Sequence, residues 1–371
     1  MNRFYLILLL VCSHISLEAR TTLKLVDSDA TKETKALYSN LWAIQKCGFM
    51  FGHHDDLTYG RYWYGTEGKS DTKDVCGDYP AVYSIDFASM MDDRYDPNSE
   101  WVESTRKNIL AARRRGEVIT ACAHLNNPLT GGNSWDNSSK EVVAGILKNG
   151  SSTQAKFNTW LDRLIGFVKD LKDDNGQPIP ILFRPFHEHT QTWNWWGRGC
   201  ATEEEFVGMW RYTVDYLIKG GIHQFIYVIS PQSHGADPKE RFTFWWPGDD
   251  YVDMLGYDYY EGENPENFCT SLRNLSAVSK RKKKPCAVTE SGLEAFRNPR
   301  YWTEQVLQPA TAKGVRVSFI VFWRNKYVGK NEKDTHYFSV YPGHPSEQDF
   351  RDFYRDKRTF FSKDLPDMYK K

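Results

Sequence analysis

The sequence predicts an α/β fold, a single (β/α)8 TIM barrel with extended βα loops. Short apolar runs recur along the 371 residues, separated by longer amphipathic stretches. Apolar strands that alternate with helices indicate a parallel sheet covered on both faces, and eight such units fit a closed barrel. An open doubly wound sheet is less favoured, because no glycine-rich phosphate-binding turn follows the first run. The eight predicted strands span residues 48–53, 81–86, 118–124, 180–188, 225–231, 252–258, 285–291 and 317–324.

Three connecting stretches have apolar residues at helical spacing, which supports this alternation. They cover residues 99–115, 160–168 and 203–218, ahead of the third, fourth and fifth predicted strands. The longest interruption, 126–152, contains two adjacent glycines and Trp135. Long βα loops commonly form binding surfaces, so we expect this loop to be one wall of a cleft.

Residues 1–19 are typical of an export signal. A charged start is followed by a run of apolar residues that is too short to span a bilayer, and then by polar residues. Cleavage after this segment would leave 20–371 as one catalytic domain. Alternatively, Cys12 would carry a lipid anchor, as in bacterial lipoproteins. We therefore expect a bacterial protein that is periplasmic, cell-surface or secreted, monomeric, and without a membrane-spanning segment.

The net charge and the cysteines limit which binding partners and how many disulfides we expect. The formal net charge is +0, so no nucleic-acid footprint is indicated. The one basic run, 280–284, is expected to be a solvated helix end or turn before a strand. Export permits disulfides, and we expect at most one or two, with a pairing that the sequence does not fix. The candidate positions are Cys47, Cys76, Cys200 and Cys269, whereas Cys122 and Cys286 lie in strand-like runs and are expected to be buried.

Two glutamates, each at the end of an apolar run, are the strongest functional signal. Glu188 ends the fourth predicted strand and Glu290 lies near the end of the seventh. Two carboxylates beside aromatic surfaces suit cleavage of a sugar chain, since one protonates the departing oxygen and the other attacks the anomeric carbon. In a barrel, functional side chains gather at the carboxyl ends of strands. We therefore expect the pair to face each other across one pocket, about 5–5.5 Å apart, as double displacement requires.

The two glutamates must differ in pKa, because one has to be protonated and the other ionised near neutral pH. Arg184 precedes Glu188 by four residues and is expected to face the same way along the strand. We expect Arg184 and a tyrosine hydroxyl to keep Glu290 anionic. The aromatic residues that follow Glu188, namely Trp193, Trp195 and Trp196, are expected to keep Glu188 neutral.

These motifs resemble glycoside hydrolase family 26 over about residues 36–340. The most specific match is Arg-Pro-Phe-His-Glu at 184–188, followed by Trp193 and the Trp-Trp-Gly of 195–197, which is similar to the family's acid/base segment. Val-Thr-Glu-Ser-Gly at 288–292 resembles its nucleophile strand, and Asp-Tyr-Tyr at 258–260 resembles its Asp-x-Tyr motif. Similar stretches at the first, third and eighth strand ends are 51–55, 124–128, 131–135 and 321–324.

The resemblance implies a retaining hydrolase that acts on β-1,4-mannan, with Glu188 as acid/base and Glu290 as nucleophile. His187 stands where many related barrel hydrolases have Asn, and the resemblance places it against the nucleophile and the reacting sugar. The stretch 189–192 departs from the family pattern, which implies changed contacts around the cleavage point. The implied substrate-binding residues are His124, Trp135, Arg184, His187, Trp193, Asp258, Tyr260 and Trp323.

Other chemistries remain as alternatives. The same reaction on mixed-linkage β-glucan or xylan is one, and a non-catalytic glycan-binding lipoprotein is another. Cleavage within the chain and release of mannobiose from chain ends are both open. Neither a cofactor nor a metal is predicted, because the histidine and acidic residues of 53–56 and 187–189 are adjacent on a strand and would face opposite sides.

Overall fold

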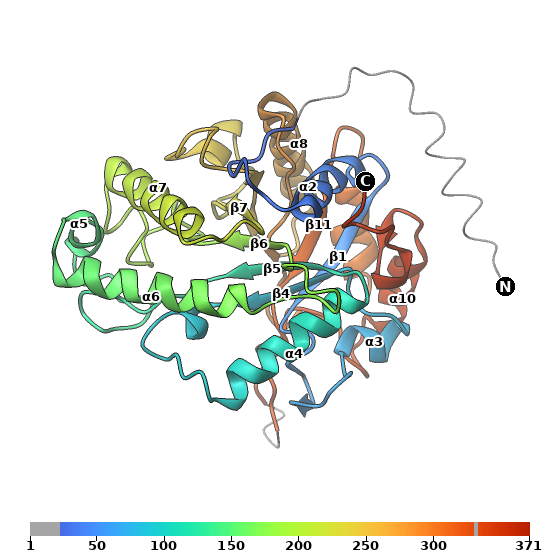
Figure 1. Ribbon diagram of the computed structural model, residues 1–371. Helices are drawn as coiled ribbons and strands as arrows, with labels where there is room; N and C mark the ends of the chain where they lie inside the picture. The colour runs from blue at the N-terminus through green and yellow to red at the C-terminus, as the bar shows by residue number, and fades with distance from the viewer. Residues whose placement is uncertain (1–22, 330–332) are drawn as a thin grey trace.

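A curled parallel sheet lies at the centre of the molecule (Figure 1). The computed structural model describes residues 23–329 and 333–371, so the predicted signal at 1–19 and Cys12 lie outside the described residues. The main path of the sheet follows the order β11-β1-β4-β5-β6-β7-β8, and β12 pairs with β1 beside that path. Its strands are β1 (Phe49–His54), β4 (Val82–Asp86), β5 (Val118–Cys122), β6 (Ile181–Arg184), β7 (Phe225–Ile229), β8 (Met254–Leu255), β11 (Phe319–Phe322) and β12 (Thr359–Phe360).

Two short strand pairs complete the β structure. The parallel pair β9 (Asp258–Tyr259) and β10 (Glu290–Ser291) carries predicted site residues, and the antiparallel pair β2 (Tyr59–Gly60) and β3 (Trp63–Tyr64) forms a hairpin after β1. Six of the predicted strands are confirmed with shifted ends. The other two, 252–258 and 285–291, are not continuous strands, so the sheet is a curled half-barrel whose main path has seven members.

Between β8 and β9 the chain passes close to two other segments at Gly256, whose backbone N–H donates to the carbonyl of Ile229 at 2.6 Å. A β-carbon there would lie 2.8 Å from the Ser230 side chain and 2.8 Å from Thr289 Oγ1, so only glycine allows three segments to approach this closely. The seventh predicted strand forms single parallel bridges, Cys286 with Leu255 and Val288 with Ile320. Residues 285–289 therefore lie between β8 and β11 without full ladders.

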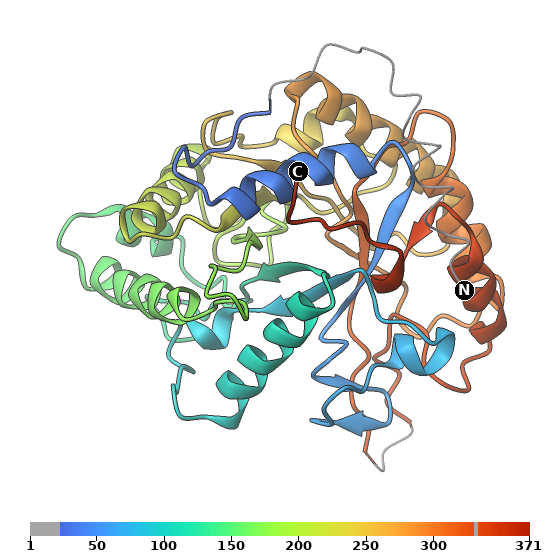
Figure 2. The same cartoon turned by 45° about the vertical axis from the view of Figure 1, so that its right-hand side comes forward.

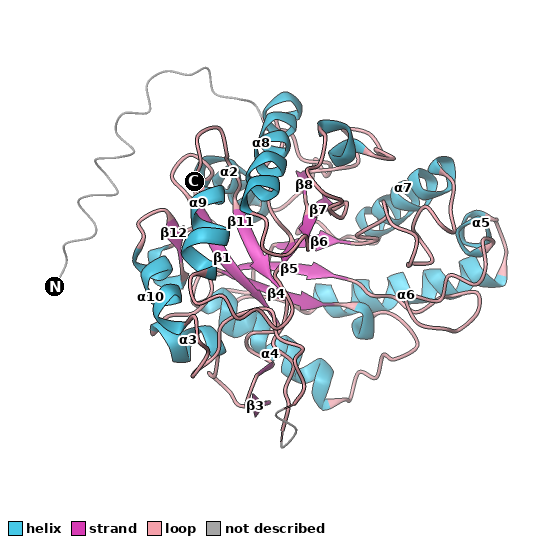
Figure 3. Ribbon diagram, turned by 180° about the vertical axis from the view of Figure 1, so that it is seen from behind, coloured by secondary structure: helices cyan, strands magenta, loops and turns pink. Residues whose placement is uncertain are grey.

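Helices surround the outside of the sheet (Figures 1 and 3). The three predicted helices are confirmed as α4, α6 and α7, which begin after the capping residues Ser99, Ser151 and Thr202. Inside the predicted loop 126–152 the structure has a short helix, α5. The helices are α2 (Lys32–Ile44), α3 (Asp71–Cys76), α4 (Glu100–Arg114), α5 (Val142–Leu147), α6 (Ser152–Lys169), α7 (Glu203–Lys219), α8 (Pro265–Lys282), α9 (Gln308–Ala310), α10 (Glu347–Arg355), and the short η1 (Ala88–Met90), η2 (Lys239–Thr243), η3 (Tyr301–Leu307) and η4 (Ser362–Asp364).

Helix α2 covers the end of the sheet at which the strands begin, and it lies beside the C-terminal segment (Figure 2). Tyr38 Oη donates to the carbonyl of Asp253, one residue before β8, at 2.9 Å. Ser318 Oγ, one residue before β11, donates to the carbonyl of Leu41 at 3.0 Å. Apolar side chains of α2 share one buried cluster with inward-facing strand residues such as Met50. A functional site is therefore expected at the opposite end of the sheet, where the strands finish.

Two smaller expectations have clear outcomes. Helix α8 ends at Lys282, and Lys283 caps it in a left-handed conformation, which confirms the basic run as a helix end. Among the described residues, Cys76, Cys200 and Cys269 are free thiols and no bridge joins any two of the four candidate positions, which is within the expected limit of one or two disulfides. No helix within 23–329 or 333–371 is long and apolar enough to cross a membrane.

Candidate active site

Three carboxylates meet where the strands end. Glu188 follows β6, Asp258 begins β9, and Glu290 begins β10 opposite Asp258 in the parallel register. One carboxylate oxygen from each residue lies within 4.8 Å of those from the other two. Glu188 and Glu290 therefore lie close together, as the sequence analysis expected, and Asp258 is the third member of the cluster.

Arg184 holds two of these carboxylates together. Its Nη1 donates to Asp258 Oδ2 at 2.7 Å, and its Nη2 forms an ion pair with Glu290 Oε1. Asp258 Oδ1 also accepts from the hydroxyls of Ser230 and Thr289, each at 2.7 Å. Burial raises the pKa of Asp258, and the Arg184 guanidinium opposes that rise. A buried cation thus separates two buried anions.

The environment of Glu188 differs from that of Glu290. The expectation that Glu188 lies on the same strand as Arg184 and faces the same way along it is wrong. Strand β6 ends at Arg184, and Glu188 lies in a turn with a left-handed backbone, at φ 57°. Its backbone N–H donates to the carbonyl of Ser230 at 2.7 Å, which ties the turn to the end of β7. A left-handed conformation is unfavourable for a residue with a β-carbon, and such strain persists where the surrounding structure fixes it.

The carboxyl of Glu188 favours its protonated form. Burial and the neighbouring charges of Asp258 and Glu290 raise its pKa well above the usual value, against a hydrogen bond from Trp193 and the charge of Arg184. The hydrogen bond runs from Trp193 Nε1 to Glu188 Oε2 at 2.9 Å. A protonated carboxyl at this place is available to donate.

Glu290 is held from both sides by donors. Opposite Arg184, Tyr260 Oη donates to Glu290 Oε2 at 2.9 Å. Burial and the charge of Glu290 raise the pKa of Tyr260 well above its usual value, so the hydroxyl keeps its proton and remains a donor. The arginine and tyrosine contacts expected from the sequence for Glu290 are therefore both present. The two donors hold the Glu290 carboxylate in one orientation.

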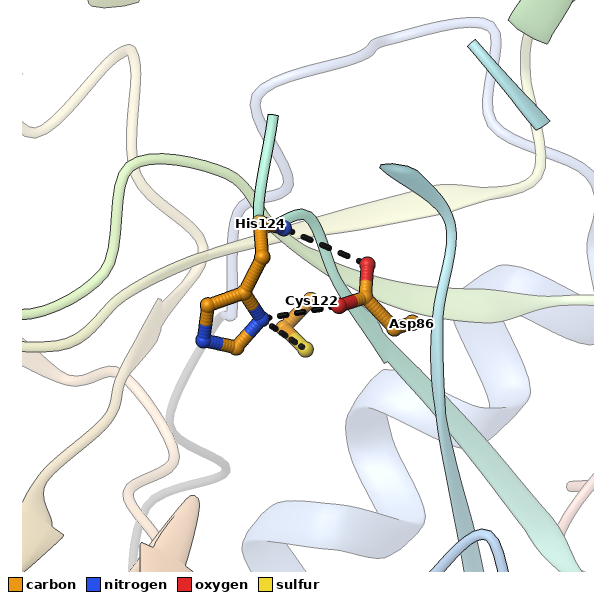
Figure 4. Close-up of side chains that lie close together, drawn as sticks. All are labelled: Asp86, Cys122 and His124. Atoms are coloured by element: carbon orange, nitrogen blue, oxygen red, sulfur yellow. Dashed lines mark hydrogen bonds and ion pairs between the residues drawn. The ribbon is translucent and has the colours of Figure 1, made fainter. Parts of the chain in front are cut away.

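A chain of polar contacts leads from β4 to the residue before Glu188. Asp86 Oδ2 pairs with His124 Nδ1 at 2.8 Å (Figure 4), and His124 Nε2 lies 3.0 Å from His187 Nε2. Burial acts to lower the pKa of His124, but the Asp86 carboxylate outweighs it and the pKa is raised. Burial and the charge of His124 lower the pKa of His187. A hydrogen bond thus joins His187 to His124, and none joins it to Glu290 among the described residues.

An open pocket of about 580 Å³ lies on the side of His124 and Asp86, and none of the three clustered carboxylates is among its lining residues. Three predicted binding residues line it: His124, Trp135 and Trp323. The Trp135 side chain is 60% exposed, and the Trp323 ring stacks on His54 with centroids 4.1 Å apart. Exposed aromatic faces beside polar groups are typical of sites that bind sugars.

Two of the tryptophans that follow Glu188 lie beneath the site. Trp195 and Trp196 are fully buried, and their indole N–H groups donate to the carbonyls of Leu125 and His187 at 3.0 Å and 2.7 Å. They pack under the turn that carries Glu188. Their role is to support this turn, because neither ring face is open to a ligand.

Sequence reasoning missed several pocket residues. Asp86 ends a predicted strand in the same way as Glu188 does, and this position was the available signal. Tyr59 and Tyr64 lie on the hairpin after β1, and Tyr327 lies beyond β11, so no local pattern linked them. Only the closing of the sheet brings these segments to one pocket.

The chain is similar to known glycosyl hydrolases. The model of glycosyl hydrolase family 26 matches residues 26–308. A mannan endo-1,4-beta-mannosidase of Bifidobacterium adolescentis is 29% identical over 92% of this chain, which spans 36% of that relative's length. The structure of a family 26 beta-mannanase from Bacteroides ovatus superposes with a TM-score of 0.85 and 36% identity, covering 92% of this chain and 98% of the other.

A second solved structure, from Muricauda sp., has a TM-score of 0.85 at 28% identity, and covers 93% of this chain and 96% of its own. The family match covers most of the described residues, and the structural match extends over nearly all of the Bacteroides ovatus protein. The chain belongs to glycosyl hydrolase family 26.

Proposed function

We propose that this protein is a β-mannanase that cleaves β-1,4-mannan or manno-oligosaccharides with retention of configuration. Similarity to proteins named mannan endo-1,4-beta-mannosidase supports the substrate. The carboxylate separation, within 4.8 Å, supports double displacement, since inverting enzymes leave about 6.5–9.5 Å for a water molecule. We also infer that residues 285–289, bridged to β8 and β11, close the half-barrel into a (β/α)8 barrel.

In the proposed reaction Glu188 and Glu290 act in turn. Glu188, protonated in its buried turn, donates to the glycosidic oxygen while Glu290 attacks the anomeric carbon. Arg184 and Tyr260 hold the attacking carboxylate in place by their hydrogen bonds. A water molecule activated by the Glu188 carboxylate then releases the sugar.

The expected result with purified protein is release of new reducing ends from unbranched mannan. Proton NMR of the first product formed should show the β-anomer before mutarotation, because two inversions retain configuration. Rates on lichenan and xylan measure the alternative substrates. Sugar binding without any new reducing ends would instead indicate a glycan-binding protein, and an initial α-anomer would contradict the proposed mechanism.

We further propose that the enzyme releases mannobiose from chain ends. Tyr64 and Tyr327 stand at the mouth of the pocket, 57% and 42% exposed, with ring centroids 5.8 Å apart. Two rings from separate segments narrow the cleft at this end. Such a barrier favours binding of a terminal sugar over a continuous chain.

The product pattern tests this barrier. We expect mannobiose as the main early product from mannohexaose, and a more even ladder of products from Tyr327→Ala, measured by chromatography over time. Tyr62→Ala is the matched control, because Tyr62 is 53% exposed near the same hairpin but does not line the pocket. An even ladder from the unmodified enzyme would mean internal cleavage instead.

Export and organisation remain proposals. We propose that residues 1–19 direct export, that residues 20–371 form one catalytic domain, and that the protein acts as a monomer outside the cytoplasm. Sequencing the N-terminus of the mature protein separates cleavage after Ala19 from lipidation at Cys12.

A further inference from the structure

Three metal-ligating side chains converge on one edge of the pocket (Figure 4). Asp86 ends β4, Cys122 ends β5, and His124 follows two residues later on the same side of the chain. His124 Nδ1 lies 2.8 Å from Asp86 Oδ2 and 3.8 Å from Cys122 Sγ. One ligand atom from each of the three lies within 4.8 Å of the others.

We propose that Asp86, Cys122 and His124 form a binding site for a soft divalent cation of the zinc class, and that occupation of this site inhibits the enzyme. A tetrahedral zinc ion with one sulfur, one nitrogen and one oxygen ligand at ordinary bond lengths holds those atoms about 3.3–3.6 Å apart. The two spacings from His124 Nδ1, 2.8 Å and 3.8 Å, are within about half an ångström of these values, and the sulfur and carboxylate oxygen lie within 4.8 Å of each other. A small side-chain movement would complete the site.

The chemistry of the three donors selects the ion. Thiolate and imidazole favour zinc or cadmium over magnesium or calcium, which prefer oxygen ligands. On binding, the ion replaces the proton on His124 Nδ1 and the thiol proton of Cys122, and both protons leave to solvent. The carboxylate and the thiolate together balance the two positive charges. The fourth ligand would be water from the pocket.

Access to the site comes from the pocket itself. The side chains of His124 and Asp86 are 20% and 28% exposed and line the pocket, whereas Cys122 is buried beneath them and does not. The nearest other partner of the Cys122 thiol is the carbonyl of Ile85, at 3.6 Å. An ion can therefore reach the thiol from the side where a sugar would bind.

The second carboxylate cluster is a poorer cation site. Glu188, Asp258 and Glu290 are also close together, but Arg184 already forms ion pairs with two of them. A divalent cation there would face a buried guanidinium at short range. Metal inhibition that depends on Cys122 would thus distinguish the two sites.

The inhibition rests on the proposed function. If the sugar binds in this pocket, an ion between Asp86 and His124 would occupy the nitrogen and oxygen atoms that line it. Binding itself does not depend on that function. Two measurements therefore distinguish metal binding from inhibition. Cadmium binding is followed by the ultraviolet thiolate-to-metal charge-transfer band, and zinc inhibition is followed by mannan hydrolysis.

With the full-length protein, we expect one equivalent of cadmium to give a charge-transfer band that is lost in Cys122→Ala. We expect zinc to inhibit mannan hydrolysis. In Cys122→Ala the half-inhibitory zinc concentration should rise at least about tenfold, because a direct ligand of the ion is lost. Magnesium and calcium should not inhibit. Cys122→Ser, which keeps the side-chain size, is the second variant if the alanine protein folds poorly.

Cys286→Ala is the matched control, because Cys286 is equally buried in a strand-like segment away from the pocket. Its cadmium band and zinc sensitivity should equal those of the unmodified protein. An absent band in the unmodified protein, or equal zinc inhibition of the Cys122 variants, would overturn the proposal.

Discussion

Replacing Glu290 by alanine is expected to reduce turnover of mannan by about 10⁴-fold or more, since the covalent intermediate can no longer form. The fold should survive, because Arg184 keeps its ion pair with Asp258 after the change. Calorimetry should still detect manno-oligosaccharide binding. Full activity in Glu290→Ala would end the assignment of Glu290 as nucleophile.

Glu188→Ala should fail in a different way. The loss of general acid catalysis costs about 10²–10⁴-fold with mannan. An aryl mannoside with an acidic leaving group needs little protonation, so its first step should survive and the intermediate should accumulate. Added azide should then restore turnover and give the β-mannosyl azide, which Glu290→Ala cannot form.

The pH profile gives a further readout for Glu188. Its pKa is raised, and the reaction requires the protonated form, so activity should fall as pH rises through that pKa. In Glu188→Ala the residual activity on the activated substrate should lose this alkaline limb. Glu304→Ala, at a carboxylate on the outer η3 segment that pairs with Arg300, should keep both rate and profile. An unchanged alkaline limb in Glu188→Ala would contradict the acid role.

Replacing Arg184 by methionine is expected to cost about 3–5 kcal/mol of unfolding free energy, as well as most of the activity. The change leaves Asp258 and Glu290 buried side by side without the cation between them. Unfolding in urea measures the loss. Adding Asp258→Asn should recover part of it, because one of the two unpaired charges is then removed.

Arg114→Met is the control for a generic loss of an ion pair. Arg114 pairs with Asp174, and both side chains are largely exposed, so solvent screens the interaction and the unfolding midpoint should not move measurably. If Arg184→Met were as stable as Arg114→Met, Arg184 would not be the cation that holds the carboxylates together.

The barrel-like fold was predictable because apolar runs and amphipathic stretches alternate strictly along the chain. Helices α4, α6 and α7 were found from spacing alone, since each buries one face against the sheet. The sixth and seventh strands were overpredicted. The backbone N–H groups of Gly256 and Asp258 still donate to the carbonyls of Ile229 and Pro231, so this segment stays paired beside β7 although it is not one continuous strand, and no property of an apolar run shows this.

The candidate site was predicted in part, and for a reason that was partly wrong. Placing Glu188 on a strand was an error, because the chain turns at Arg184 and sets Glu188 in a left-handed conformation. The tryptophans at 195 and 196, which were expected to keep Glu188 neutral, are buried below this turn. Aromatic residues near a carboxylate do not show by sequence which face they present.

The sequence by itself was enough to identify the two glutamates, to place them at the ends of apolar runs, and to indicate the family. These are properties of single segments, and parallel strands bring their ends to the same edge by geometry alone. Only the tertiary structure decided that Asp86 pairs with His124, that His124 contacts His187, and that Tyr64 and Tyr327 line the same pocket. The physical reason is that these contacts join segments from different strands and loops, and their distances depend on how the sheet curls rather than on any local pattern.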